Sequence, residues 1–439
     1  MFRALLCLAV AAVASAQNWP QFRGVRNTGI ADGQNLPLIW TTAWQTPIPG
    51  LGHSSPIVWG DRVFLTTAIS SNQDSVFEPV AKGPVDMRTD EAPHQWHVYC
   101  LDRKTGKILW DRLAFESAPR IHRHPHNSYA SETPATDGKH LVVSFGSQGL
   151  YVYNFDGDLL WKQDLGVIHS GKHNNPEYTW GTASSPAILG QNVIVLCDSL
   201  GDGYLAAFDL ETGREVWRTP RDAHPSWSTP GIIERGGSAE VVVNAAPFIQ
   251  SYDAATGKEL WRLGPSTTNT TPTPVFGDGL IFVANGYNPI KPIYAVRPGS
   301  RGDLTLQNGA ASSSAIAWSD LRNGPYMATP LVYRGMLYVV SLNGILTTFE
   351  AKTGKMIYQK RIAPSGYSAS PLGSDGRVYI GSEDGDLYVI KAGTEFEILG
   401  KKSFDEVLMA TPAIVDGMML VRTEHHVFAS APAAQRPSR

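Results

Sequence analysis

One short motif recurs along the chain and constrains the fold more than any other feature. An acidic residue is followed by two variable positions, then Thr-Gly, and then an aromatic residue four positions after the glycine. The motif occupies residues 102–110, 209–217, 253–261 and 350–358, with Tyr358 replacing tryptophan in the last copy. Self-similarity at this spacing predicts a repeat architecture, in which each repeat is one supersecondary unit.

A second marker gives the number of repeats. A Ser or Thr stands directly before a proline and an apolar segment eight times, at Pro56, Pro134, Pro186, Pro230, Pro274, Pro330, Pro371 and Pro412. Successive prolines are 41 to 78 residues apart, and the shortest spacing matches a four-stranded propeller blade. Between markers, β-branched and aromatic segments alternate with Gly/Asp turns, which are hairpin signals. We therefore predict an all-β, eight-bladed β-propeller of four-stranded antiparallel blades.

The last blade is short, because only two or three strands fit after Pro412. We predict that segment 38–47, which contains Trp44, supplies the missing strand and closes the ring without an open sheet edge. The chain then divides into a signal peptide (1–16), an N-terminal leader (17–39), one propeller (40–431) and a polar tail (432–439).

The first sixteen residues have the features of an export signal. One arginine precedes the apolar run 4–10, and the small residues Ala14-Ser15-Ala16 predict cleavage before Gln17. We expect an exported protein, periplasmic or extracellular, with no transmembrane segment. The net charge of −3 provides no footprint for nucleic acid, and we expect a monomer. Cys100 and Cys197 fall in non-neighbouring blades, which favours free buried thiols over a disulfide.

The Asp-x-x-Thr-Gly-x-x-x-Trp segments resemble the tryptophan-docking motif of the quinoprotein-type (PQQ-like) propeller repeat family. The leader at 18–24, Asn-Trp-Pro-Gln-Phe-Arg-Gly, is similar to that of secreted members which resemble BamB-like outer-membrane assembly propellers. The resemblance covers residues 18–430 and implies that an aromatic residue of one blade stacks on its neighbour. The residues expected to take part are Gly106, Trp110, Trp161, Gly213, Trp217, Gly257, Trp261, Gly354 and Tyr358.

The resemblance implies two kinds of function. Quinoprotein alcohol dehydrogenases share an adjacent cysteine pair, a catalytic aspartate and a calcium held by Glu and Asn side chains. This chain has no adjacent cysteines and no local run of oxygen ligands for calcium. We therefore predict a non-enzymatic scaffold without cofactor or metal, which binds a protein, peptide or carbohydrate, including in cell-envelope assembly. The alternative is a divergent PQQ-dependent dehydrogenase that uses PQQ with calcium.

The residue two positions before each marker proline is expected to face the ring axis. Seven of these residues are small or cyclic, whereas Glu132 is a carboxylate. Glu132 is either a ligand contact or a solvated or Arg-paired group at the rim. Aromatic and polar residues just upstream form a candidate funnel for a planar ligand, a sugar or an extended peptide, unless they pack against the next blade. They are His53, Tyr129, Trp180, Trp227, Tyr326 and Tyr367.

Three histidines alternate with other residues in the connection before Thr133-Pro134. In an extended segment His122, His124 and His126 would share one face. A metal site would need several such groups to converge within a fixed second shell, and we predict none.

Overall fold

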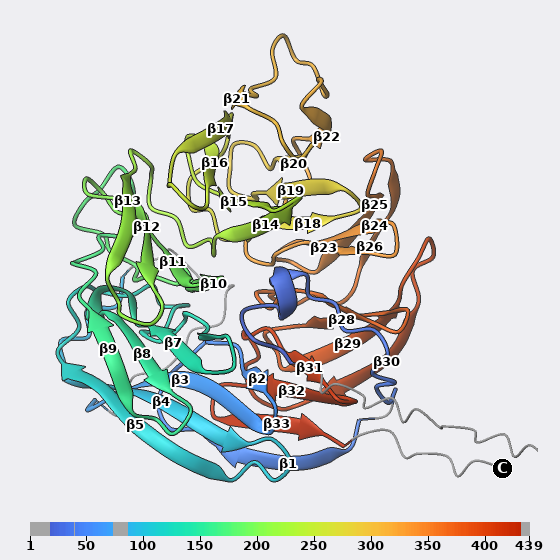
Figure 1. Ribbon diagram of the computed structural model, residues 1–439. Coiled ribbons are helices and arrows are strands. Elements are labelled where there is room, and N and C mark those ends of the chain that lie inside the picture. Colours follow the sequence, from blue (N-terminus) through green and yellow to red (C-terminus); the bar gives the residue numbers. More distant parts are fainter. Residues whose placement is uncertain (1–17, 39, 73–86, 432–439) are drawn as a thin grey trace, which may run out of the picture.

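The computed structural model describes residues 18–38, 40–72 and 87–431, which form a closed ring of eight β-sheets (Figure 1). The fold prediction is confirmed. The helices of this part of the chain are two short 3-10 turns, η1 (Val25–Asn27) and η2 (Gly146–Gln148). Neither has the length or apolar character needed to cross a bilayer. The predicted signal peptide and polar tail lie outside the described residues.

Each of the first four blades is an antiparallel sheet whose strands follow one another from the axis outward. Blade 1 contains β2 (Ile57–Trp59), β3 (Arg62–Ser70), β4 (His94–Asp102) and β5 (Ile108–Ser117). Blade 2 contains β6 (Ala135–Thr136), β7 (His140–Ser144), β8 (Leu150–Asn154) and β9 (Leu159–Gln163). Blade 3 contains β10 (Ala187–Leu189), β11 (Asn192–Cys197), β12 (Tyr204–Asp209) and β13 (Glu215–Pro220). Blade 4 contains β14 (Gly231–Arg235), β15 (Ser238–Val243), β16 (Ile249–Asp253) and β17 (Glu259–Leu263).

The other four blades complete the ring. Blade 5 contains β18 (Val275–Gly277), β19 (Leu280–Ala284), β20 (Ile293–Val296) and β22 (Ile316–Asp320). Blade 6 contains β23 (Leu331–Tyr333), β24 (Met336–Val340), β25 (Ile345–Glu350) and β26 (Met356–Arg361). Blade 7 contains β27 (Leu372–Ser374), β28 (Arg377–Gly381), β29 (Asp386–Lys391) and β30 (Ile398–Ser403). Blade 8 contains β31 (Ala413–Val415), β32 (Met418–Arg422), β33 (His426–Ser430) and, as its outermost strand, β1 (Thr42–Pro47). The short strand β21 (Gly302–Asp303) adds to blade 4 in parallel with β17.

Every innermost strand begins directly after the proline of a Ser/Thr-Pro marker, as β2 does after Pro56 and β27 after Pro371. Proline has no backbone N–H to donate, which suits a position at the start of a strand. The blade count from the sequence is therefore correct. The ring closes where β1 pairs antiparallel with β33, with Thr46 opposite Val427. The predicted closing strand is confirmed, although it begins only at Thr42.

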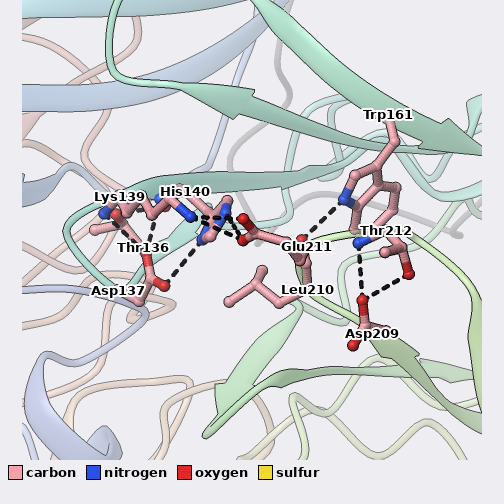
Figure 2. A network of polar contacts seen from close by, with 9 residues as sticks. All are labelled: Thr136, Asp137, Lys139, His140, Trp161, Asp209, Leu210, Glu211 and Thr212. Atoms are coloured by element: carbon pink, nitrogen blue, oxygen red, sulfur yellow. Dashed lines mark hydrogen bonds and ion pairs between the residues drawn. The ribbon is translucent and has the colours of Figure 1, made fainter.

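Tryptophans of the outermost strands dock on the neighbouring blade. The indole N–H of Trp161 donates to the carbonyl oxygen of Leu210 at 2.9 Å (Figure 2). The ring lies over Gly213, where φ is 71° and an added Cβ would lie 2.7 Å from the indole. Glycine is required by this backbone conformation and by the close approach. Four other tryptophans donate their indole N–H in the same way to a backbone carbonyl oxygen of the next blade: Trp44 to Arg103, Trp110 to Phe155, Trp217 to Ala254 and Trp318 to Ala351.

The other residues of the motif build the turn that receives the indole. Oδ1 of Asp209 accepts from the backbone N–H of Thr212 at 2.8 Å and from its hydroxyl at 2.6 Å. A polar cluster supports the same joint between blades 2 and 3: Nζ of Lys139 forms an ion pair with Glu211 at 2.6 Å, and Nε2 of His140 lies 2.8 Å from the same carboxylate (Figure 2). The hydrogen bonds between Asp209 and Thr212 close the turn that receives the indole, which explains the fixed spacing of the acidic residue, threonine and glycine in the motif.

Two residues of the predicted docking set make different contacts. Trp261 donates from Nε1 to Oε2 of Glu240 in its own blade, at 2.9 Å, instead of to the next blade. Tyr358 packs edge-on against Phe396 of the next blade, with ring centroids 5.9 Å apart. Trp318 docks in the regular way, although no Thr-Gly motif precedes it in the sequence.

The N-terminal leader covers one end of the channel that runs along the ring axis. Its helix η1 lies near the middle of the ring (Figure 1). The leader follows the turns between the first and second strands of blades, where the N–H of Gly417 donates to Gln34 at 2.9 Å. Arg23 is fully buried and donates to the carbonyl oxygens of Thr329, Pro330 and Pro371, at 3.0 to 3.2 Å. The leader is therefore anchored to the inner strands of the ring.

Candidate functional site

The Ser and Thr residues of the eight markers line one cavity of about 130 Å³ on the ring axis. Six of their hydroxyls accept a hydrogen bond from the backbone N–H of the equivalent residue in the preceding blade, at 2.9 to 3.1 Å. These acceptors are Thr133, Ser185, Thr229, Thr329, Ser370 and Thr411. A hydroxyl that accepts a bond can still donate its own proton. The marker therefore links the blades and gives the channel a polar, uncharged wall.

The prediction that the residue two before each proline faces the axis is wrong by one position. Successive side chains of an extended segment point to opposite sides, so the residue next to the proline takes the axial place. Glu132 is only 2% exposed and accepts a hydrogen bond from the hydroxyl of Thr182. Burial raises the pKa of Glu132 to about 7, and the bond from Thr182 offsets part of this effect. Glu132 therefore does not line the channel or the chamber, and it is buried instead of solvated at the rim.

At the end opposite the leader, the channel widens into a cavity of about 300 Å³, the aromatic chamber. The connections between successive blades and the loops between second and third strands supply its walls. The lining residues are His124, His126, Asn127, Trp180, Ala183, Trp227, Asn269, Thr271, Tyr287, Tyr326, Met327 and Leu342. The chamber and the channel share Trp227, His126 and Met327, so the two cavities are continuous. Phe22 of the leader lines the channel part.

Aromatic rings form two walls of the chamber. Trp180 and Trp227 have ring centroids 6.0 Å apart, and His124 stands edge-on to Trp180 at 5.5 Å. On the other wall, the rings of Tyr287 and Tyr326 are 5.5 Å apart. Trp227 is held in place because its indole N–H donates to the carbonyl oxygen of Gly181 at 2.7 Å. Such walls suit a planar ring or a large apolar side chain.

The chamber is uncharged near neutral pH. Burial, together with the nearby His126 and Arg123, lowers the pKa of His124 to about 3. Burial also lowers the pKa of His126. The pKa of Tyr326 is raised to about 12 by burial and by Tyr287. These imidazoles and the Tyr326 phenol are therefore neutral, and binding in the chamber depends on rings and hydrogen bonds more than on charge.

The structure brings together half of the predicted funnel residues. Trp180, Trp227 and Tyr326 line the chamber, whereas His53 lines the narrower channel. Tyr129 and Tyr367 are buried, with 7% and 0% of their surface exposed, and they do not line either cavity. For these two residues the alternative interpretation, packing within the ring, describes their environment.

Several chamber residues were not predicted as ligand contacts. His124 and His126 both line the chamber, with ring centroids 4.7 Å apart, while His122 does not. The alternation of these histidines was a signal for a shared face. Tyr287 lies in the loop between β19 and β20, and no motif of the sequence marks that loop.

Comparison with known families gives a match over more than half of the chain. The model of the family described as outer membrane protein assembly factor BamB matches residues 94–243 and 245–366. The chain belongs to this family. The BamB of Alteromonas naphthalenivorans is 26% identical over 281 residues, which cover 59% of this chain and 60% of that protein. The match thus spans less than two thirds of that relative's length.

Solved structures show the same architecture. The crystal structure of BamB from Moraxella catarrhalis has a TM-score of 0.54 and 14% identity, covering 83% of this chain and 98% of that one. Quinohemoprotein alcohol dehydrogenase from Comamonas testosteroni has a TM-score of 0.64 and 13% identity, covering 96% of this chain and 82% of that one. At these identities the likeness concerns the fold alone, and function depends on the site.

The residues of the channel and chamber do not fit a quinone held by calcium. Calcium prefers six to eight oxygen ligands, commonly including carboxylates. The two cavities are lined by hydroxyls, amides, imidazoles and aromatic rings, and no carboxylate of the described chain is among their lining residues. Glu132, the carboxylate that the sequence pattern placed in the channel, accepts a hydrogen bond from the hydroxyl of Thr182 and lines neither cavity. Within the described ranges, no three His, Cys, Asp or Glu side chains are grouped to hold a metal.

Proposed function

We propose that this chain is a binding scaffold of the bacterial cell envelope that docks a polypeptide partner at the aromatic chamber during outer-membrane assembly. The observation that carries the proposal is the chamber itself, an uncharged aromatic cavity of about 300 Å³. It opens at the end of the channel opposite the leader. Membership of the BamB family supports the role in assembly.

The geometry favours recognition over chemistry. Rigid rings commonly carry their recognition residues on connecting loops, and the chamber is built from such loops. Tryptophan and tyrosine are enriched among residues that dominate binding energy, because they offer large, rigid contact surfaces. Trp180 and Trp227 supply such surfaces here: the two rings pack together, and Trp227 is also fixed by its bond to Gly181. A partner that inserts one large apolar side chain would bury it without leaving a charge unpaired.

Site-specific photo-crosslinking in cells of the source organism tests the proposal. A photoreactive amino acid at Tyr287, which is 39% exposed at the chamber, is expected to crosslink to components of outer-membrane assembly. The matched control places it at Val216 on the outer edge of blade 3, which is 47% exposed. Crosslinking at Tyr287 is expected to fall at least fivefold when Trp180→Ala is added.

Two outcomes would contradict the proposal. The first is the absence of assembly proteins among the products at Tyr287, or equal crosslinking from Val216. The second is saturable quenching of the tryptophan fluorescence by pyrroloquinoline quinone with Ca²⁺, lost in Trp227→Phe and accompanied by dye-linked alcohol oxidation. That result would favour a dehydrogenase.

A further inference from the structure

A positively charged groove adjoins the chamber between blades 5 and 6. This basic groove has a volume of about 290 Å³ and contains the cationic side chains of Lys291, Arg322 and Arg361, with no acidic residue of the described ranges in its lining. Asn323, Asn343 and Gln359 add amide groups to the same wall. The three cations come from the loop before β20, the connection after β22 and the end of β26. The fold alone brings them together.

A larger cavity connects the basic groove to the chamber. It has a volume of about 850 Å³ and shares Lys291 and Arg361 with the groove. It shares Tyr287, Tyr326 and Leu342 with the chamber. A ligand could therefore occupy the aromatic walls and the cations at the same time.

The cations of the groove form no ion pair within the described ranges, although Glu383 and Asp384 line the adjoining cavity with Lys291 and Arg361. Among the described residues, Lys291 and Arg322 make no side-chain ion pair, and Arg361 donates to the carbonyl oxygen of Asn343 at 2.7 Å. The nearby Asp320 accepts from the backbone N–H groups of Arg322 and Asn323, so it caps the loop. The chain as a whole is slightly acidic, with a net charge of −3. A local excess of cations in such a chain indicates an anionic partner group.

We propose that the partner segment is an extended acidic polypeptide that places carboxylates in the basic groove and one aromatic or bulky aliphatic side chain in the chamber. The inference rests on the proposed function and specifies the partner. The connecting cavity favours a polypeptide over a uniform polyanion, because the exposed Asp384 also lines it. A chain of identical anions would be repelled there, whereas a polypeptide can present neutral or basic residues.

Fluorescence anisotropy with the mature protein tests the inference. The probes are labelled peptides with one tryptophan and three aspartates, separated by two, four or six Gly/Ser residues. We expect saturable binding by at least one spacer length, weakened by salt because exposed charges are screened. Replacing the aspartates by asparagine, or the tryptophan by alanine, is expected to weaken binding about tenfold.

Charge reversal locates the binding site. The double variant Lys291→Glu/Arg322→Glu is expected to weaken binding of the acidic peptide about tenfold, because two attractions become repulsions. The matched control, Lys107→Glu/Lys258→Glu, makes the same charge change in the exposed turns at the other end of the ring and is expected to leave affinity unchanged. A melting curve confirms that both double variants are folded.

Three results would overturn the inference: equal affinity for the acidic and amide peptides, equal loss in the control variant, or tighter binding of an oligogalacturonate than of any peptide. These results are separable from failure of the proposed function. If crosslinks from Tyr287 to assembly proteins persist while the peptides fail, the partner chemistry is wrong and the function stands. If the peptides bind as expected but those crosslinks are absent, the assembly role is wrong.

Discussion

The indole of Trp44 lies over Gly106, so the strand nearest the N-terminus locks directly onto the first blade. Its Nε1 donates to the carbonyl oxygen of Arg103 at 2.9 Å. Gly106 has φ of 72°, and a Cβ at this position would overlap the indole. Trp44 therefore repeats, at the junction of the last and first blades, the contact that Trp161 makes with Gly213. Ring closure combines this contact with the pairing of β1 and β33.

Trp44→Ala is expected to lower the free energy of unfolding by about 3–5 kcal/mol, the usual range for a buried tryptophan. The substitution would remove the contact between the last and first blades, at the junction that closes the ring. Urea denaturation followed by circular dichroism measures it. Gln45→Ala, at an exposed position of the same strand, is expected to change stability by less than about 0.5 kcal/mol. Equal effects of the two substitutions would show that docking of Trp44 does not stabilise closure.

Arg23→Met is expected to release the leader from the ring. The guanidinium has only carbonyl partners, and burial lowers its pKa to about 9. Methionine keeps much of the side-chain volume but leaves the carbonyls of Thr329, Pro330 and Pro371 without these donors. Losing buried partners of this kind costs about 3 kcal/mol. The variant should also be cut by trypsin after Arg26 under native conditions.

Arg26→Met is the matched control for the stability measurement. Arg26 pairs with Glu234 at 3.2 Å, and the two side chains are 70% and 45% exposed. Exposed pairs of this kind contribute at most about 1 kcal/mol. If both variants lost the same stability, the buried contacts of Arg23 would not anchor the leader.

The sequence predicted the ring well because its markers have local causes. The proline of each marker starts an inner strand, and the Asp, Thr and Gly of the docking motif build one turn. Both features are complete within a few residues. Closure by Trp44 followed from counting strands after Pro412.

The site was predicted less well because its contacts join distant segments. The hydroxyl of Thr133 accepts from Ser55 of the preceding blade, so no single repeat reveals which residue faces the axis. The error in register placed Glu132 in the channel. Tyr287 and the cations of the basic groove reach their places only through the packing of blades 5 and 6, and no motif marks them.

Cys100 and Cys197 are expected to resist thiol reagents in the native protein. Both are free and buried, and burial raises the pKa of each thiol to about 12. The thiolate is the reactive form, so both access and ionisation are suppressed. Mass spectrometry after maleimide treatment at pH 8 should show labelling of these two residues only when urea is present. Rapid labelling of either residue without denaturant would contradict this environment.

Glu132→Gln is expected to remove a specific pH dependence of stability. The pKa of Glu132 is about 7 in the folded chain, compared with an ordinary value of 4.5. Below pH 4.5 the carboxyl is protonated in both states. As the pH rises from 4.5 to 7, the unfolded state loses the proton while the folded state retains it. The folded state therefore binds more protons, and its stability falls over this window by on the order of 3 kcal/mol.

Urea midpoints of the wild-type protein and Glu132→Gln at pH 4.5 and pH 8 measure this effect. The amide keeps an oxygen to accept from Thr182 but cannot ionise, so the variant should gain stability relative to the wild type on going to pH 8. Glu211→Gln is the control, because the bond from Lys139 lowers the pKa of Glu211, so this variant and the wild type should differ by nearly the same amount at the two pH values. Glu211 contributes stability above its ordinary pKa, and that contribution is lost only as the pH falls below 4.5. A constant difference between Glu132→Gln and the wild type at the two pH values would show that Glu132 ionises normally.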